Sequence, residues 1–196
     1  ASENTAMGYG ALTSKTTGAS NTALGRGAMR DNTTSNNNTA VGAFALDANT
    51  TGGDNVAIGK STLPKNTTGG FNTACGKGAL NQNTTASNNV AVGFDAMVLN
   101  TTGATCTAVG TEALKRNTTG HDNTCIGYRA GQYLQTSGGS NGHENTIIGG
   151  LAGDSLTTGH NNVCLGYDSE PSSSTSNNSV TLGNSSTSDL RCNDTS

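Results

Sequence analysis

His121, His143 and His160 are the three histidines of this 196-residue sequence, and they follow one another at intervals of 22 and 17 residues. Asp122 and Glu144 directly follow the first two. Neutral imidazoles bind metals readily, and their charge changes near physiological pH. If the intervening segments stack, the rings form a ladder roughly 5 Å apart. The pattern indicates a metal or proton-sensitive site, with polar decoration of a turn as the favoured alternative.

The element that must position these histidines is a repeat marked by a glycine every 17 residues, interrupted by one step of 22. Self-similarity at a fixed period is typical of repeat architectures. We therefore predict an all-β parallel β-roll or β-solenoid of eleven coils, with residues 1–196 as one repeat domain and a segment of a longer fibre protein. The repeat glycines are Gly8, Gly25, Gly42, Gly59, Gly76, Gly93, Gly110, Gly127, Gly149, Gly166 and Gly183.

Each repeat reads as a strand, a glycine bend, a second element and a turn, counted here from its glycine as position 0. Position −1 is always apolar, −3 is Thr or Val, and −2 is usually small, as in Thr39-Ala40-Val41. This two-residue period predicts a short strand, with −3 and −1 facing the core and −2 forming a flat outer face for other chains. Ala-Leu pairs such as Ala45-Leu46 predict a second short strand, with the leucine in the core.

An Asn-Thr-Thr sequence closes most coils, as in Asn49-Thr50-Thr51-Gly52. Asn and Gly tolerate left-handed backbone, and Asn and Thr side chains can bond to nearby backbone groups. The same letters match the N-glycosylation acceptor. We favour the turn interpretation for the whole set, which is Asn32, Asn49, Asn66, Asn83, Asn100 and Asn117.

Position +1 carries aromatic and cationic residues, which are Tyr9, Phe94, Tyr128 and Tyr167 with Arg26, Lys60 and Lys77. An exposed stripe of this kind suits cell-surface carbohydrate or protein. The candidate surface-binding residues are Tyr128, Tyr167 and Phe94. Coverage of a seam between chains is an equally good interpretation.

The composition argues against several functions. Charged residues are 12% of the chain and the net charge is −3, which predicts no nucleic-acid partner. Apolar runs are too short to predict membrane insertion. Five cysteines lack metal-binding spacing, and Cys125 and Cys164 lie two coils apart, too far for a disulfide. No phosphate loop or H-E-x-x-H helix occurs, so we expect no enzyme and no cofactor. Residues 135–142, inside the 22-residue step, are interpreted as a Gly/Ser spacer loop.

The recurring pattern N-T-A-V-G, A-L, N-T-T-G, seen for example at Asn38-Thr39-Ala40-Val41-Gly42, resembles the head repeats of trimeric autotransporter adhesins. It is still more similar to repeat regions of related bacteriophage tail fibres. The resemblance covers the whole chain and implies a homotrimeric, triple β-helical fibre on the outside of a cell or virion. Residues 189–193 are similar to the junction before the self-cleaving chaperone of some tail fibres. The 17-residue unit is longer than that of most autotransporter heads.

Three functions follow as hypotheses. The first is a structural shaft of a trimeric fibre or adhesin that attaches to a host or other surface. The second is an extracellular filament built by end-to-end stacking of coils. The third, ranked lower, is an ice-binding solenoid, because the Thr-Thr pairs are expected in turns while a flat ice-binding face needs outward residues at alternating strand positions. A polysaccharide-degrading enzyme ranks last.

Overall fold

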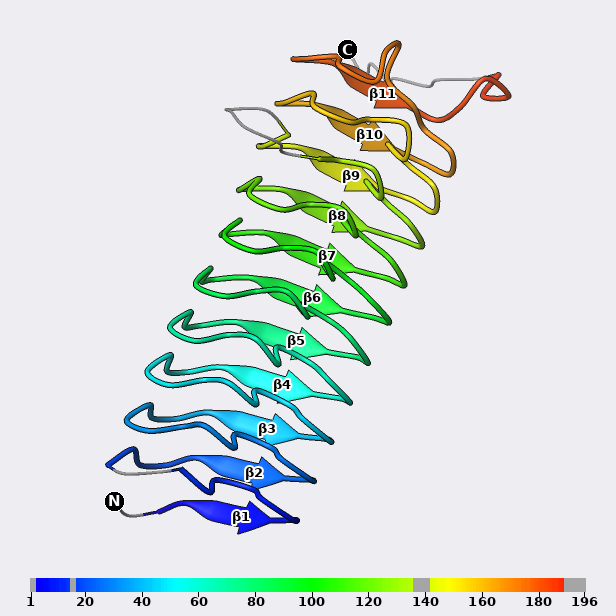
Figure 1. Ribbon diagram of the computed structural model, residues 1–196. Helices are drawn as coiled ribbons and strands as arrows, with labels where there is room; N and C mark the ends of the chain where they lie inside the picture. Colours follow the sequence, from blue (N-terminus) through cyan, green and yellow to red (C-terminus); the bar gives the residue numbers. More distant parts are fainter. Residues whose placement is uncertain (1–2, 15–16, 136–141, 189–196) are drawn as a thin grey trace, which may run out of the picture.

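Eleven parallel strands of three residues each form one sheet and run up one side of a stack of coils (Figure 1). The computed structural model describes residues 3–14, 17–135 and 142–188. The predicted all-β parallel solenoid is therefore confirmed, whereas the core of the predicted spacer loop (136–141) and the C-terminal junction (189–193) lie outside the described residues. The strands are β1 (Thr5–Met7), β2 (Thr22–Leu24), β3 (Thr39–Val41), β4 (Val56–Ile58), β5 (Thr73–Cys75), β6 (Val90–Val92), β7 (Thr107–Val109), β8 (Thr124–Ile126), β9 (Thr146–Ile148), β10 (Val163–Leu165) and β11 (Val180–Leu182).

Every strand pairs with the next in full register, so that equivalent positions of all coils form straight lines along the stack. Ala40 of β3, for example, pairs with Ala57 of β4. The repeat glycine ends each strand because the chain bends there with φ near 134° at Gly42. A Cβ on Gly42 would lie 2.5 Å from the carbonyl oxygen of Gly59, so side chains are excluded from this line of stacked bends.

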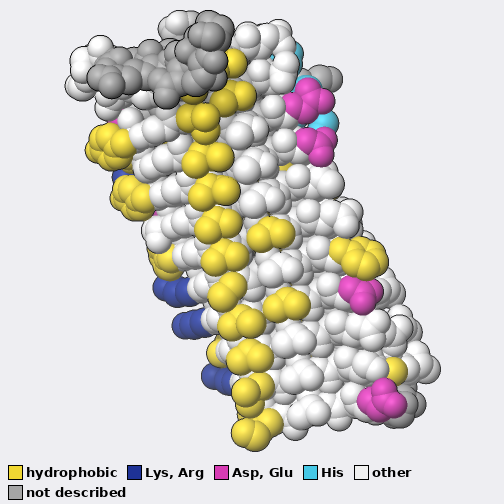
Figure 2. Space-filling model, turned by 180° about the vertical axis from the view of Figure 1, so that it is seen from behind, with side chains coloured by type: hydrophobic (Ala, Val, Ile, Leu, Met, Phe, Trp, Pro, Cys, Tyr) yellow, Lys and Arg dark blue, Asp and Glu magenta, His cyan; other side chains and the backbone are white. Residues whose placement is uncertain are grey.

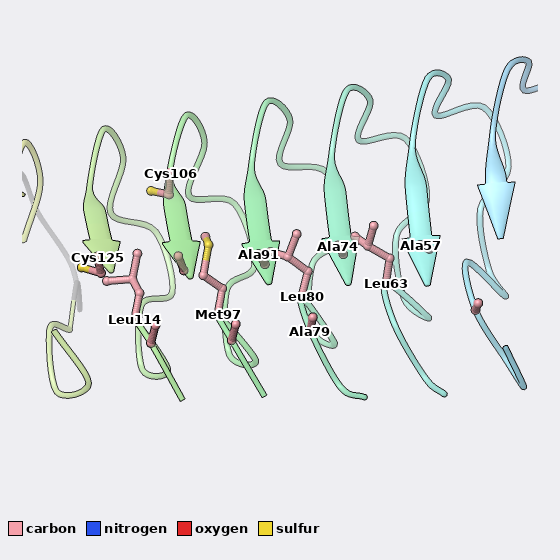
Figure 3. Packing of buried hydrophobic residues seen from close by; sticks show 14 of the residues in the cluster. Ala57, Leu63, Ala74, Ala79, Leu80, Ala91, Met97, Cys106, Leu114 and Cys125 are labelled. Carbon is pink, nitrogen blue, oxygen red and sulfur yellow. The ribbon is translucent and has the colours of Figure 1, made fainter. Parts of the chain in front are cut away.

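The faces of the strands are the reverse of the prediction. The residue at −2, which is small in every strand from β2 to β10 except β9 (Ile147), points inward and is fully buried there, whereas −3 and −1 lie on the outer face. Figure 3 shows the reason: Leu and Met side chains from the opposite wall, such as Leu63, Leu80 and Met97, already fill the interior facing these strands. The remaining space fits a methyl or thiol group on these strands, because protein interiors are close-packed. The larger Ile147 of β9 lies against Gly131 and Gly153, which replace the +4 leucine in the coils of β8 and β9.

The predicted second strand is also absent from the described coils. The leucine or methionine at +4 has a left-handed backbone, with φ of 51° at Leu46 and 50° at Met97. This conformation costs an L-residue roughly 1–2 kcal/mol and cannot belong to an extended strand. Its side chain is nevertheless fully buried, and its amide donates to the next coil, as from Leu46 to the Thr62 carbonyl at 3.0 Å. Core burial and stacking outweigh the local preference.

Two lines of buried asparagine hold the interior corners of the coils. At +7, Nδ2 of Asn66 donates to Oδ1 of Asn49 at 2.9 Å and to the Gly69 carbonyl at 2.8 Å. At −4, backbone and side-chain nitrogens of Asn55 both donate to Oδ1 of Asn38, at 2.9 and 3.1 Å. Such ladders are typical of stacked parallel strands. Because the Asn-Thr-Thr asparagines are fully buried, the turn interpretation is confirmed over the glycan-acceptor one.

Cys106, Cys125 and Cys164 fill interior space, whereas Cys75 stands at −1 on the outer face, and none of the four forms a disulfide in the described part of the chain. Cys125 and Cys164 stand at −2 with Ile147 of β9 between them, which bears out their predicted separation. Burial raises the pKa of Cys106 and of Cys164 to about 11, so both stay protonated near neutral pH. Among the described residues, no helix has the length and apolar content needed to span a membrane.

Candidate functional site

The outer face of the sheet carries a continuous apolar line, here called the ridge, made by the −1 residues of all eleven strands (Figure 2). The ridge arises because the inward turn of −2 forces −1 outward. Ile58 is 41% exposed and Ile126 37%, which is high for large aliphatic side chains in a regular sheet. The ridge residues are Met7, Leu24, Val41, Ile58, Cys75, Val92, Val109, Ile126, Ile148, Leu165 and Leu182.

The predicted surface-binding residues lie along one edge of this outer face. Phe94, Tyr128 and Tyr167 follow the repeat glycines after β6, β8 and β10, and all three are exposed. Since alternate coils supply them, they stand about two strand spacings, or roughly 10 Å, apart. Lys77 Nζ lies 5.3 Å from the centre of the Phe94 ring, and the Arg129 guanidinium lies 5.0 Å from that of Tyr128. The structure thus aligns them in one stripe, while their binding role stays a prediction.

The three histidines form the ladder that their spacing predicts. Ring centroids of His121 and His143 are 4.9 Å apart with an interplanar angle of 15°, and those of His143 and His160 are 5.2 Å apart at 12°. The rings are therefore stacked face to face. Because the rings are stacked, their nitrogens lie at different heights along the stack and do not converge on one point at which a metal ion could bind. No group of three or more His, Cys, Asp or Glu in the described ranges is placed to hold a metal ion.

Carboxylates accompany only part of this histidine stack. Nδ1 of His121 lies 2.7 Å from Oδ2 of Asp122, and hydrogen bonds from His121 and Thr105 hold the pKa of Asp122 below its ordinary value. Nδ1 of His143 is 3.4 Å from Oε2 of Glu144, a charge contact without hydrogen-bond geometry. Nδ1 of His160 is buried and has no described partner. The arrangement fits the proton-sensitive hypothesis better than the metal one, and both remain predictions.

The opposite edge of the outer face carries a line of acidic residues, of which the sequence analysis named only Asp122 and Glu144, as neighbours of histidines. Position −5, which has a left-handed backbone, holds Glu3, Asp54, Asp122 and Glu144, all exposed. Phe71 occupies the same position in the coil of β5 and is 64% exposed. The signal was present in the repeat, because aligning the coils on their glycines places these carboxylates in one line. The carboxylates at −5 precede each strand and the residues at +1 follow it, so the two lines border the outer face on opposite edges.

Comparison with protein-family models, with curated proteins and with solved structures gives no significant match. The class that the fold itself defines is a parallel β-solenoid with an uncovered, ridged sheet face.

Proposed function

We propose that the chain is a structural segment of an extracellular or virion-surface fibre whose copies associate as homotrimers through the outer face of the sheet, and that this fibre mediates attachment to a host or other surface. The exposed ridge along β1 to β11 is the observation that carries the proposal. Long apolar strips rimmed by polar residues are typical of protein–protein contacts. The resemblance of the repeats to fibre and adhesin segments supports the trimer and the attachment role.

The dimensions of the face suit a stable interface. Eleven strands at 4.7–4.9 Å span roughly 50 Å, and the seven residues from −5 to +1 span about 15–20 Å. The face therefore offers roughly 800–1000 Å² per chain, close to the approximately 800 Å² per partner of standard interfaces. A thin interior lined mainly by Ala, Leu and Met gives a second reason for association, since small cores alone stabilise poorly.

The decisive measurement is the mass of the chain in solution by analytical ultracentrifugation. We expect three times the chain mass, and a purely monomeric protein would contradict the proposal. Replacing Ile58, Val92 and Ile126 of the ridge by Ser should dissociate the trimer because it removes apolar surface at the centre of the contact. Val98, partly exposed on another part of the coil, supplies a control as Val98→Ser, which should leave the mass unchanged.

The attachment role rests on the aromatic stripe. Replacing Tyr128 and Tyr167 by Ser should weaken binding to cell-surface carbohydrate or protein if the stripe is a receptor site. Loss of the trimer instead would place these rings in the seam between copies. Binding to glycan arrays and sedimentation of the same samples separate the two outcomes.

End-to-end growth is the alternative within the structural class. β1 and β11 each pair on one side only among the described strands, and unpaired strand edges can template further stacking. Electron microscopy distinguishes rods of fixed length, expected for a trimeric shaft, from open-ended filaments, expected for continued stacking.

Ice binding is a second candidate because the structure supplies a geometry that the sequence did not predict. The outward −3 and −1 positions alternate along each strand, and −3 is Thr in seven strands, β1, β2, β3, β5, β7, β8 and β9. A flat, regular array of threonine and aliphatic groups is the kind of surface on which water can order. Thermal hysteresis of the purified protein tests this candidate, and its absence would exclude it.

A further inference from the structure

The residues that follow the repeat glycines, here called the +1 line, alternate in size with a period of two coils along one edge of the outer face (Figure 2). After every even-numbered strand from β2 to β10 the line carries an exposed cationic or aromatic side chain, which are Arg26, Lys60, Phe94, Tyr128 and Tyr167. After β3, β7 and β9 it carries Ala43, Thr111 and Gly150, and Lys77 after β5 is the exception. The large side chains of the even coils therefore recur at two strand spacings, or roughly 10 Å.

The fold does not impose this two-coil period. Its own repeat is one coil, and Lys77 and Phe94 occupy adjacent coils, so the strand spacing admits two large side chains in succession. The alternation also continues across the 22-residue step, because β8, β9 and β10 pair in register and keep Tyr167 two coils from Tyr128. The period is therefore a property of the surface and matches a ligand that repeats at twice the height of a coil.

The upper half of the +1 line presents aromatic rings to solvent. Phe94, Tyr128 and Tyr167 are all exposed. A Cβ on Gly150 would lie 3.6 Å from Cδ2 of Tyr167, so the Tyr167 ring extends along the line over the coil of β9, where no side chain occupies the space. Exposed aromatic rings offer a broad apolar surface with a polar edge, on which the C–H groups of sugar rings can pack.

The lower half of the +1 line offers positive charge. In the described ranges no carboxylate forms an ion pair with its three cations, which are Arg26, Lys60 and Lys77. By contrast, Lys115 and Arg129 share the carboxylate of Glu112, at 2.6 and 2.8 Å. Lys60 and Lys77 belong to adjacent coils, so two like charges stand about one strand spacing apart without a counter-charge. An anionic ligand would relieve this repulsion.

An extended polysaccharide of β-1,4-linked sugars matches the +1 line in period. Successive sugars of such a chain alternate in orientation, and two of them advance roughly 10 Å, the same as two strand spacings. Every second sugar would thus meet a large side chain, and the sugars between would lie over the small residues. From Arg26 to Tyr167 the line covers eight strand spacings, or roughly 38 Å, which accommodates about eight sugars.

We propose that the +1 line binds an acidic, β-1,4-linked polysaccharide that lies parallel to the stack of coils. Its carboxylates lie against the cationic half of the line, and its sugar rings pack on the aromatic half. The inference rests on the attachment role proposed above and names the class of ligand that the exposed stripe takes. The cations contribute mainly to specificity and to the rate of encounter, whereas the rings supply the apolar contact.

Oligosaccharides of equal charge and different linkage test the period. Isothermal titration calorimetry with β-1,4-linked mannuronate oligosaccharides should show an affinity that rises with length up to about eight sugars, the length of the line. Oligosaccharides of α-1,4-linked galacturonate carry the same charge per sugar but do not keep the 10 Å period, and they should bind about tenfold more weakly or less. Equal affinity for both would assign the binding to charge alone and overturn the inference, as would no binding of mannuronate.

Moving one ring by one coil tests the same period on the protein. The variant Thr111→Tyr/Tyr128→Thr keeps the composition of the line but replaces its even ring spacing by one of about 5 and 15 Å. It should bind the mannuronate octasaccharide about tenfold more weakly, as Tyr128→Thr alone should. Unchanged affinity of the ring-shifted variant overturns the inference. Circular dichroism and sedimentation of the same samples show whether the fold and the oligomer are kept.

The cations are tested by Lys60→Gln/Lys77→Gln, which should weaken mannuronate binding by about tenfold and leave binding of the neutral β-1,4-linked glucose octasaccharide unchanged. Lys65→Gln is the matched control, because Lys65 donates to Gln82 and lies outside the +1 line. A trimer that attaches to cells but ignores linkage, ring position and these lysines overturns the inference and leaves the proposed function standing. A ring-shifted variant that loses the trimer places the line in the seam and also overturns the inference. A monomer with the expected binding overturns the trimer alone.

Discussion

The coils of β3 to β7 and those of β8 to β10 share one backbone but differ in the side chains that line it. In the first group the +7 position holds a hydrogen-bonded asparagine in every coil, from Asn49 to Asn117. In the coils of β8 and β9 the same position holds Leu134 and Leu156, both fully buried, and in the coils of β8 to β10 the −6 corner carries the histidine stack. Strand register continues unchanged across the boundary. The backbone pairing between coils is therefore the same in both groups, whereas the side chains at one repeat position can differ in chemistry from coil to coil.

The asparagine ladder at +7 ends at the boundary between these two groups of coils. Nδ2 of Asn117 donates to Oδ1 of Asn100 at 2.8 Å, but Oδ1 of Asn117 is buried and accepts from no described residue. The next coil offers Leu134 there, which cannot donate. Asn117 is thus the last member of the ladder and keeps a buried acceptor without a partner.

The largest expected effect breaks the ladder in its middle. Asn66→Leu removes two donated hydrogen bonds and the one that Asn66 accepts from Asn83 at 2.9 Å. Each buried group left unpaired costs about 1–3 kcal/mol. Asn117→Leu should cost clearly less, because it also removes an unpaired buried oxygen and extends a line already occupied by leucine. Urea unfolding of the two variants measures the difference, and equal losses would show that the ladder has no special role.

An intermediate effect should appear when the histidine stack is interrupted. The His143 ring is stacked between those of His121 and His160, with centroid distances of 4.9 and 5.2 Å, so His143→Ala removes both ring contacts at once. Stability of the coils of β8 to β10 should therefore fall, while that of β3 to β7 should not.

Amide hydrogen exchange resolved by residue measures this difference between the two regions. In the variant the amides of β8 to β10 should exchange faster, and those of β3 to β7 should exchange at the unchanged rate. Unchanged exchange in β8 to β10 would show that the ring stack does not stabilise these coils.

The smallest effect should come from repairing the −4 ladder at its one interruption among the described coils of β2 to β10. Cys106 stands where the neighbouring coils have Asn89 and Asn123; its backbone N–H donates to Asn89 Oδ1 at 2.9 Å, but its thiol offers Asn123 no equivalent oxygen. Cys106→Asn should add up to about 1 kcal/mol of stability by continuing the ladder. Thermal unfolding measures the gain, and a destabilised variant would show that the thiol packs better than an amide here.

Much of the fold could be predicted from the repeat, and the candidate site only in part. The strand at −3 to −1, the glycine bend, the eleven coils and the 5 Å histidine ladder follow from the spacing and agree with the structure. The second strand was predicted wrongly. A left-handed backbone at the +4 leucine is locally unfavourable, and only the burial of its side chain in the folded stack stabilises that conformation. The buried asparagine ladders were interpreted as turn chemistry alone, although their recurrence at −4 and +7 was a signal that they face the interior.

The amino-acid sequence by itself determined the period, and with it which residues of different coils stand in line. A strict repeat needs no knowledge of contacts, since equal spacing brings equivalent positions together in any stacked arrangement. Only the tertiary structure decided which side of each strand is the inside. A two-residue period fits equally well with −2 facing inward or with −3 and −1 facing inward. The inward position went to −2 because Leu and Met at +4 fill the interior from the opposite wall. That decision turned the aliphatic line outward as the ridge, with the +1 residues along one edge of the outer face and the −5 carboxylates along the other.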